Sequence, residues 1–210
     1  MSILRDEKKQ QTKEQILKSA KEIFISEGYT KTTIAKIAKH AHIGIGTFYN
    51  YFKSKSEVFL FTFNGHPEEL IRNTKFVLDN PSDDLLETIL ELTNIYLDSY
   101  LKIDKKFWQE IVSAFALNVR DNIEAMTEFV EVDMKFVEQL SELIILYKQK
   151  GVLSADFDEF AGAQSIYSIF ALQILLYIYV EDLPFDIMKN NIVTQIKLYF
   201  ANKVNNFSHE

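Results

Sequence analysis

Residues 41–55 read AHIGIGTFYNYFKSK, and this stretch decides the fold of the N-terminal part of the chain. Two of the six glycines, Gly44 and Gly46, lie within three positions, and four aromatic residues and two lysines follow them. The preceding segment places apolar residues at the i, i+3, i+4, i+7 spacing of a helix face, at positions 34, 37, 38 and 41. A short helix, a tight turn that contains glycine and a second short helix, from about residue 44 to residue 51, predict a helix-turn-helix.

The composition is typical of a water-soluble, mostly helical protein. The 210 residues are enough for a buried core in one domain or two. Only three prolines and six glycines are present, without repeated strand-like segments. The absence of cysteine excludes a disulfide, a thiol nucleophile and a thiolate metal site. Residues 1–10 carry charges where a signal peptide needs an apolar run, so we expect a cytoplasmic protein.

Charge is distributed unevenly along the chain, whose formal net charge is −7. Residues 1–60 hold eleven Lys and Arg against six Asp and Glu, whereas residues 61–210 hold twelve against twenty-four. A basic N-terminal module would face phosphates while the acidic remainder faces away from them. An uneven solvated surface explains the same numbers equally well, so charge alone does not decide between the two interpretations.

The periodicity of apolar residues predicts helices along the whole chain, and the fold class we expect is all-α. Gly28, which follows the first helix, suits a left-handed C-terminal cap. The expected helical segments are 10–27, 33–40, 44–51, 55–65, 68–78, 85–101, 104–119, 121–150, 157–180 and 185–203.

Three segments of the N-terminal region agree together with one known pattern: 16–24 (ILKSAKEIF), 28–38 (GYTKTTIAKIA) and 41–59. They resemble the tetracycline-repressor (TetR) family of bacterial regulators. The resemblance is specific because glycine, aromatic and lysine positions match at once. It implies an all-α homodimer in which an N-terminal three-helix helix-turn-helix head, residues 1–55, binds DNA. A larger C-terminal helical domain, residues 56–210, would bind an effector and form the dimer.

The resemblance also implies roles for individual residues of the head. Thr33, the hydroxyl of Tyr49 and Lys55 would contact phosphate, and residues 44–47 would form the N-terminal edge of the recognition helix. Ile34, Ile37, Phe48 and Phe52 match core positions. The full set of DNA-binding candidates is Thr33, Gly44, Ile45, Gly46, Thr47, Tyr49, Asn50, Lys53 and Lys55.

Two positions depart from the family pattern. Gly44 stands where serine is common, which weakens that helix cap, and Ile45 stands where lysine or a polar residue is common. Isoleucine cannot hydrogen-bond a base edge, although it can touch a thymine methyl group. We therefore expect phosphate contacts to be more secure than base contacts. Without the family pattern, Tyr49 would be a half-buried aromatic residue, and Lys53 and Lys55 would be solvated lysines.

Enzymatic, metal and cofactor sites fit the sequence poorly. The spacing of Gly44 and Gly46 lacks the preceding strand, the third glycine and the G-K-[ST] of a phosphate loop. His40 and His42 have no convincing third ligand nearby. The motifs G-x-S-x-G, H-E-x-x-H and E-x-x-H do not occur. We therefore expect no enzyme, no metal and no cofactor.

Residues 160–180 contain no charge, and 21 residues could span a bilayer. Four polar side chains within them and acidic flanks without lysine or arginine argue against a membrane. A helix that is apolar nearly all round is also typical of a buried dimer helix, and in the TetR family the last two helices pair with those of a second copy. The candidate interface residues are Phe170, Ile174, Tyr177 and Leu198.

Large aromatic residues are frequent between residues 85 and 150, and most of them must belong to the core. Packed between helices, they can also leave an elongated apolar cavity with tyrosine hydroxyls as polar groups. Arg72 and Arg120 are the only arginines beyond the head, so we expect a hydrophobic or amphipathic effector. The candidate ligand-binding residues are Tyr96, Tyr100, Trp108, Phe115 and Phe129.

The sequence thus predicts a homodimeric transcriptional repressor. It would bind a palindromic operator in double-stranded DNA and leave it when a hydrophobic small molecule binds. One alternative is a regulator of the same fold without an effector. Another, from a different class, is a helical interaction or enzymatic module on a borrowed head. Retention on DNA at low salt that is lost at high salt would favour a regulator, whereas turnover of a metabolite without DNA binding would favour the enzyme.

Overall fold

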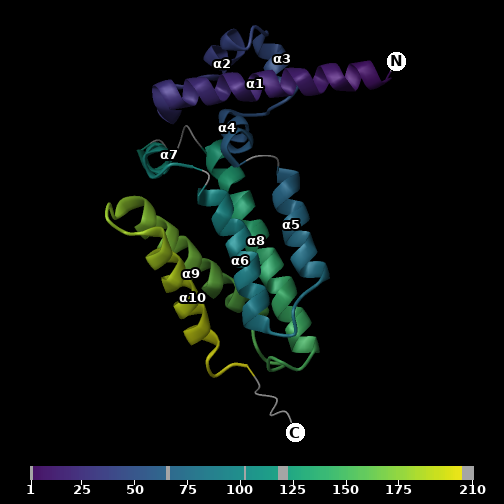
Figure 1. Ribbon diagram of the computed structural model, residues 1–210, viewed down its shortest axis with the longest axis vertical. Coiled ribbons are helices and arrows are strands. Elements are labelled where there is room, and N and C mark those ends of the chain that lie inside the picture. The colour runs from purple at the N-terminus through teal and green to yellow at the C-terminus, as the bar shows by residue number, and fades with distance from the viewer. Residues whose placement is uncertain (1, 65–66, 102, 118–122, 205–210) are drawn as a thin grey trace. The chain divides into compact units, whose positions relative to one another are not determined.

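The computed structural model describes residues 2–64, 67–101, 103–117 and 123–204, and these residues form ten helices (Figure 1). One isolated antiparallel bridge joins Leu153 to Val204. The all-α fold expected from the sequence is confirmed. The helices are α1 (Ser2–Lys31), α2 (Ile34–His40), α3 (Ile45–Tyr49), α4 (Lys55–Asn64), α5 (Pro67–Asp79), α6 (Leu85–Leu101), α7 (Lys105–Leu117), α8 (Ile123–Gln149), α9 (Glu159–Tyr179) and α10 (Phe185–Phe200).

Packing divides the chain into two compact units. The first unit contains Met1–Pro67 together with Lys102–Val130, and the second contains Glu68–Leu101 together with Glu131–Glu210. Helix α7 therefore packs with the N-terminal helices although it lies far from them in sequence. The functional boundary between residues 55 and 56 stays a prediction.

The first unit is built on α1, which packs against α2, α4 and α7. Its ring cluster is fully buried: Phe59 of α4 meets Phe24 edge-to-face at 5.1 Å and Tyr29 at 5.2 Å between ring centroids. Such pairs add stabilisation to the burial of the rings themselves. Near its end α1 bends at Gly28, whose φ of 78° is positive as expected, although its ψ of 167° is that of an extended residue. The helix begins at Ser2 and not at residue 10.

Helices α2 and α3 form the helix-turn-helix. Thr33 caps α2, because its hydroxyl accepts a hydrogen bond from the backbone N–H of Lys36 at 3.2 Å. The residue with positive φ in the turn is His42, at 53°, and not one of the glycines. Gly44 caps α3 at a φ of −74° without a side-chain hydrogen bond, so the weak cap expected from the sequence is present. Neither Gly44 nor Gly46 has a positive φ, so the tight turn does not use the backbone freedom that glycine allows.

In the second unit α9 and α10 lie side by side (Figure 1). Asp158 caps α9 by accepting from the N–H of Ala161 at 2.9 Å. Lys148 of α8 bonds the carbonyl of Phe157 at 2.6 Å and the carboxylate of Glu159 at 2.8 Å, which fixes the start of α9. Among the described residues α9 alone is long and apolar enough to cross a membrane. Its Gln173 is buried and accepts a hydrogen bond from Asn191 of α10 at 3.3 Å, a polar contact typical of a protein core.

Candidate nucleic-acid interface

Helix α3 is anchored by one ring and presents the rest of its residues outward. Phe48 is fully buried and contacts the rings of Tyr49 at 5.8 Å and Phe52 at 5.8 Å. Ile45 is 50% exposed and Tyr49 is 53% exposed, and Gly46, Thr47 and Asn50 are exposed as well. The structure therefore gathers the predicted recognition residues on one open surface.

Neither contacts within the protein nor backbone conformation require glycine at Gly44 or Gly46. A Cβ atom at Gly46 would meet nothing within 4 Å, and one at Gly44 would meet only the Thr47 hydroxyl at 3.8 Å. Neither residue has a positive φ. A bare backbone on an open face leaves room for the close approach of an external partner.

The phosphate-contact candidates occupy the ends of α2 and α4. Thr33 is exposed, and Lys53 is exposed just before α4. The start of α4 is fixed by Ser54, whose hydroxyl accepts from the N–H of Glu57 at 2.9 Å, while the Glu57 carboxylate accepts from the N–H of Lys53. This reciprocal arrangement resembles a capping box and holds the loop that carries both lysines.

Lys55 differs from a solvated lysine. Its ammonium donates to the carbonyl of Tyr29 at 3.1 Å and lies 4.3 Å from the centre of the Tyr29 ring. Burial lowers the pKa of Lys55 below its usual value. Because an ammonium carries three donors, this internal contact leaves capacity for a phosphate oxygen.

The predicted dimer residues separate into two groups. Phe170 and Ile174 are only 1% and 6% exposed, and the Phe170 ring packs on Phe136 at 5.2 Å. Their assignment to a surface between protomers is therefore wrong, because the core of the second unit already covers them. Tyr177 is half-buried against Phe185, whereas Leu198 is 70% exposed.

A different apolar stripe of α9 and α10 is open. Leu172, Leu175, Leu176 and Tyr179 follow one another at helical spacing i, i+3, i+4 and i+7, and all four are exposed. On α10, Ile187 and Leu198 are exposed and eleven residues apart, which places them on one face. Hydrophobic periodicity alone could not distinguish this stripe from the inward-facing one.

Of the predicted effector residues whose side chains the structure describes, Tyr96, Tyr100 and Trp108, none lines the pocket along α5 or the pocket between α1, α4 and α7. Tyr96 and Tyr100 lie in the second unit, whereas Trp108 is buried in the first. The hydroxyl of Tyr96 donates to Gln139 at 2.8 Å, and that of Tyr100 donates to Asp133 at 2.5 Å. Phe115 and Phe129 lie on α7 and α8, but their side chains fall outside the described residues.

Asp133 of α8 is a half-buried acid that the sequence reasoning missed. Burial raises its pKa above the usual range, although hydrogen bonds from Tyr100 and Tyr167 oppose the shift. Asp133 lies three residues before the buried Phe136, so an acid on the apolar stripe of α8 was the available signal.

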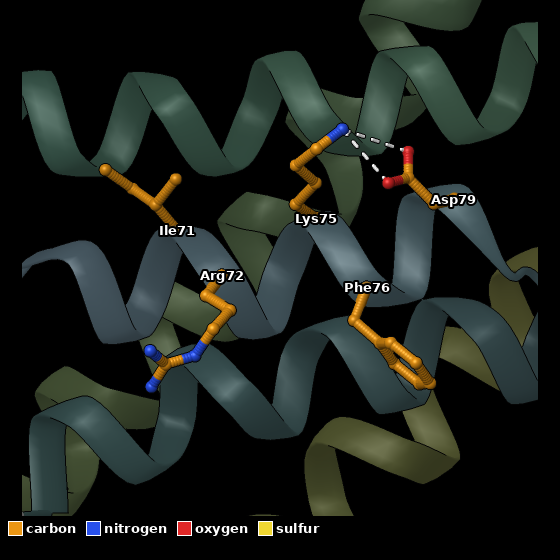
Figure 2. A pocket seen from close by; sticks show the side chains of 5 residues that line it. All are labelled: Ile71, Arg72, Lys75, Phe76 and Asp79. Atoms are coloured by element: carbon orange, nitrogen blue, oxygen red, sulfur yellow. Dashed lines mark hydrogen bonds and ion pairs between the residues drawn. The ribbon is translucent and has the colours of Figure 1, made fainter.

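Each of the two units has a surface pocket. The first unit has a pocket of about 580 Å³ where α1, α4 and α7 meet, lined by Gly28, Phe63, Phe107 and Glu110 among others. The second unit has one of about 480 Å³ along α5, where Ile71 and Phe76 are exposed (Figure 2). There Lys75 pairs with Asp79 at 3.0 Å.

Comparison with known proteins locates the similarity in the same region. Residues 16–60 match the model of "Bacterial regulatory proteins, tetR family". Over 57 residues the chain is 39% identical to the HTH-type transcriptional regulator TcmR of Streptomyces glaucescens. That match covers 27% of this chain and 25% of the relative. The chain thus spans about a quarter of that relative's length.

Solved structures resemble nearly the whole chain. A protein from Syntrophomonas wolfei described as a TetR-family transcriptional regulator is 21% identical, with a TM-score of 0.70 over 92% of this chain and 96% of its own. The TetR-family repressor FadR of Thermus thermophilus, solved with lauroyl-CoA, is 20% identical, with a TM-score of 0.65 over 89% and 92%. At these identities the likeness establishes the fold.

The half-buried Asp133 generates a prediction about stability. Because the pKa of Asp133 is raised in the folded protein, its stabilising contribution is present at acid pH and is lost as pH rises through that pKa. An asparagine there keeps an acceptor for a tyrosine hydroxyl and carries no charge. The melting temperature of Asp133→Asn minus that of the wild type should therefore increase as pH rises from about 4 to 8.

Thermal unfolding across this pH range measures the difference. Asp98→Asn on α6, at an exposed position, is the control for the loss of one negative charge. A melting temperature of Asp133→Asn that falls relative to that of the wild type as pH rises would contradict the assignment of an unfavourably placed carboxylate.

Proposed function

We propose that this chain, whose residues 16–60 belong to the tetR family of bacterial regulatory proteins, is a homodimeric DNA-binding transcriptional regulator that responds to an apolar or amphipathic small molecule. The observation that carries this proposal is the open face of α3. One buried ring, Phe48, anchors the helix, and Ile45, Thr47 and Tyr49 project from a backbone that is bare at Gly46. This face suits a major groove, where recognition helices approach bases and phosphates closely.

Charge and polar groups around this face support DNA as the partner. Lys31, Lys39 and Lys53 are exposed in the same unit, within a region of net positive charge. Thr33 and Tyr49 add hydroxyl donors that suit phosphate oxygens. Ile45 favours apolar contact with a thymine methyl group over a base-edge hydrogen bond.

The exposed stripe of α9 and α10 supports a second copy of the chain as a further partner. Contiguous apolar residues rarely remain open on a soluble monomer, and a two-fold interface lets one stripe cover its own copy. Two heads would then read the two halves of a palindromic operator. The acidic remainder of the chain would stay away from the DNA.

The aromatic and polar core of the second unit supports an effector with an apolar part. Tyr96 stacks on Phe136 at 4.1 Å between centroids, and the hydroxyls of Tyr96 and Tyr100 already have partners. An effector that enters there gains apolar contacts and must replace those hydrogen bonds. The lauroyl-CoA bound to Thermus thermophilus FadR has such an apolar part, its acyl chain, joined to the charged coenzyme A. An effector acts by favouring the arrangement of the heads that cannot dock on both half-sites.

Substitutions in the head should weaken DNA binding without regard to sequence. Tyr49→Phe and Lys55→Ala each remove a phosphate contact, so affinity for specific and random duplexes should fall together. For Lys55→Ala the slope of log affinity against log salt should decrease by about 1 per half-site, because one fewer counterion is released. Fluorescence anisotropy over a salt series measures this. Lys75→Ala on α5 is the charge-matched control. An unchanged slope for Lys55→Ala would show that Lys55 does not contact phosphate.

Charges placed on the exposed stripe should separate the protomers. Leu172→Asp and Leu198→Asp each bury a carboxylate in the proposed interface, so sedimentation equilibrium should find monomers. Ile71→Asp, at an exposed position on α5, should leave the dimer intact. Ile174→Asp should instead reduce folded protein, since Ile174 belongs to the core. Stable dimers of both Leu172→Asp and Leu198→Asp would show that this surface is not the dimer interface.

Compounds with an acyl chain should release the protein from DNA. Lauroyl-CoA and laurate should both do so, whereas coenzyme A alone should not, because the apolar part carries the binding. DNA release is followed by anisotropy, and binding by the fluorescence of Trp108, the single tryptophan. Release by coenzyme A alone, or only by polar anionic metabolites, would exclude an apolar effector while leaving the DNA-binding proposal intact.

A further inference from the structure

Tyr29, directly after the bend of α1, is held through its backbone and its ring by two other helices. Its N–H donates to the carboxylate of Glu110 on α7 at 3.1 Å. Its carbonyl accepts from the ammonium of Lys55 on α4 at 3.1 Å. Its ring packs on Phe24 and Phe59 and carries the Lys55 ammonium on one face. One residue thus joins an acid of α7 to a lysine that we assign to the DNA interface.

The same carboxylate also lies against the bend itself. Gly28 has a φ of 78°, a conformation that other residues rarely adopt. A Cβ atom built on Gly28 would lie 2.3 Å from an oxygen of Glu110, so the carboxylate occupies the space that a side chain would need. Thr32 closes the following turn by donating to the carbonyl of Gly28 at 2.7 Å. Glu110 therefore contacts the bend at Gly28 and at the next N–H.

The position of Lys55 follows from that of Tyr29. Lys55 is the first residue of α4, and its side chain is half-buried against Tyr29 instead of extending into solvent. A lysine held in this way loses less conformational entropy when it binds phosphate than a freely rotating one does. Displacement of the Tyr29 backbone would release the ammonium from its place.

We propose that Glu110 is a positioning residue for DNA binding: it fixes the Tyr29 backbone and thereby the Lys55 ammonium that meets phosphate. This inference rests on the proposed function. It also assigns α7, which begins at Lys105 and lies outside the predicted head of residues 1–55, a direct part in the geometry of the head. A purely structural role for Glu110 would change only the stability of the first unit.

The experiment combines a local probe with a double-mutant cycle in the full-length protein. Glu110→Ala removes the acceptor, Glu110→Gln keeps a neutral one, and Glu91→Ala on α6 is the control for loss of an exposed carboxylate. Hydrogen exchange of the Tyr29 amide reports the contact without DNA. Affinity for a DNA duplex selected from a random pool is measured at a temperature where thermal unfolding finds every variant folded.

Glu110→Ala should speed exchange of the Tyr29 amide and weaken DNA binding by about tenfold, the scale of one charge-assisted hydrogen bond. Glu110→Gln should restore most of the affinity, and Glu91→Ala should match the wild type in both measurements. In the Lys55→Ala background, Glu110→Ala should have less than about a twofold further effect, because the two residues act in series.

The measurements distinguish a failure of the proposed function from a failure of the positioning role of Glu110. Wild-type protein that selects no DNA would overturn the proposed function, and this inference with it. If the wild type binds, unchanged affinity of Glu110→Ala or full additivity with Lys55→Ala overturns the positioning role alone. An unchanged rate of exchange at Tyr29 would show that the carboxylate does not hold this amide.

Discussion

The bend of α1 at Gly28 is the constraint on which the first unit depends. It turns the chain so that the Tyr29 ring enters the cluster with Phe24 and Phe59, and it exposes a backbone N–H that the helix itself cannot satisfy. The carboxylate of Glu110 supplies the partner, and the side chain of Lys55 covers the ring. The end of α1, from which the chain continues into α2, is thereby attached to α4 and α7 through hydrogen bonds and aromatic packing at one position.

Much of the fold could be predicted because helix signals are local. The long apolar stripes placed α6 at Leu85–Leu101, where the structure has it, and α7 to α10 within a few residues of their expected ends. Ser54 and Thr33 are residue types that favour helix caps, and both cap helices in the structure. The start of α1 was missed because residues 2–9 are polar and carry no stripe, although a polar sequence can still continue a helix.

The sequence predicted which residues belong to the candidate site better than it predicted which other residues they contact. The face of α3 is open as its sequence indicated, but the contact from Lys55 to the Tyr29 carbonyl joins residues 26 positions apart, and no local pattern reports it. Phe170 and Leu172 belong to the same apolar helix, and only packing against Phe136 decides which of them faces inward. Likewise, the residue with positive φ in the turn is His42, although glycine, which adopts such a conformation more readily, stands two positions later.

The central claim is that two copies of this chain place two α3 helices on one DNA duplex. Selection of bound sequences from a random pool of double-stranded DNA by the full-length protein tests it most directly. The account predicts enrichment of an inverted repeat whose two halves are separated by about one helical turn or a multiple of it. Recovery of no enriched sequence, or of enriched sequences without two-fold symmetry, would contradict it.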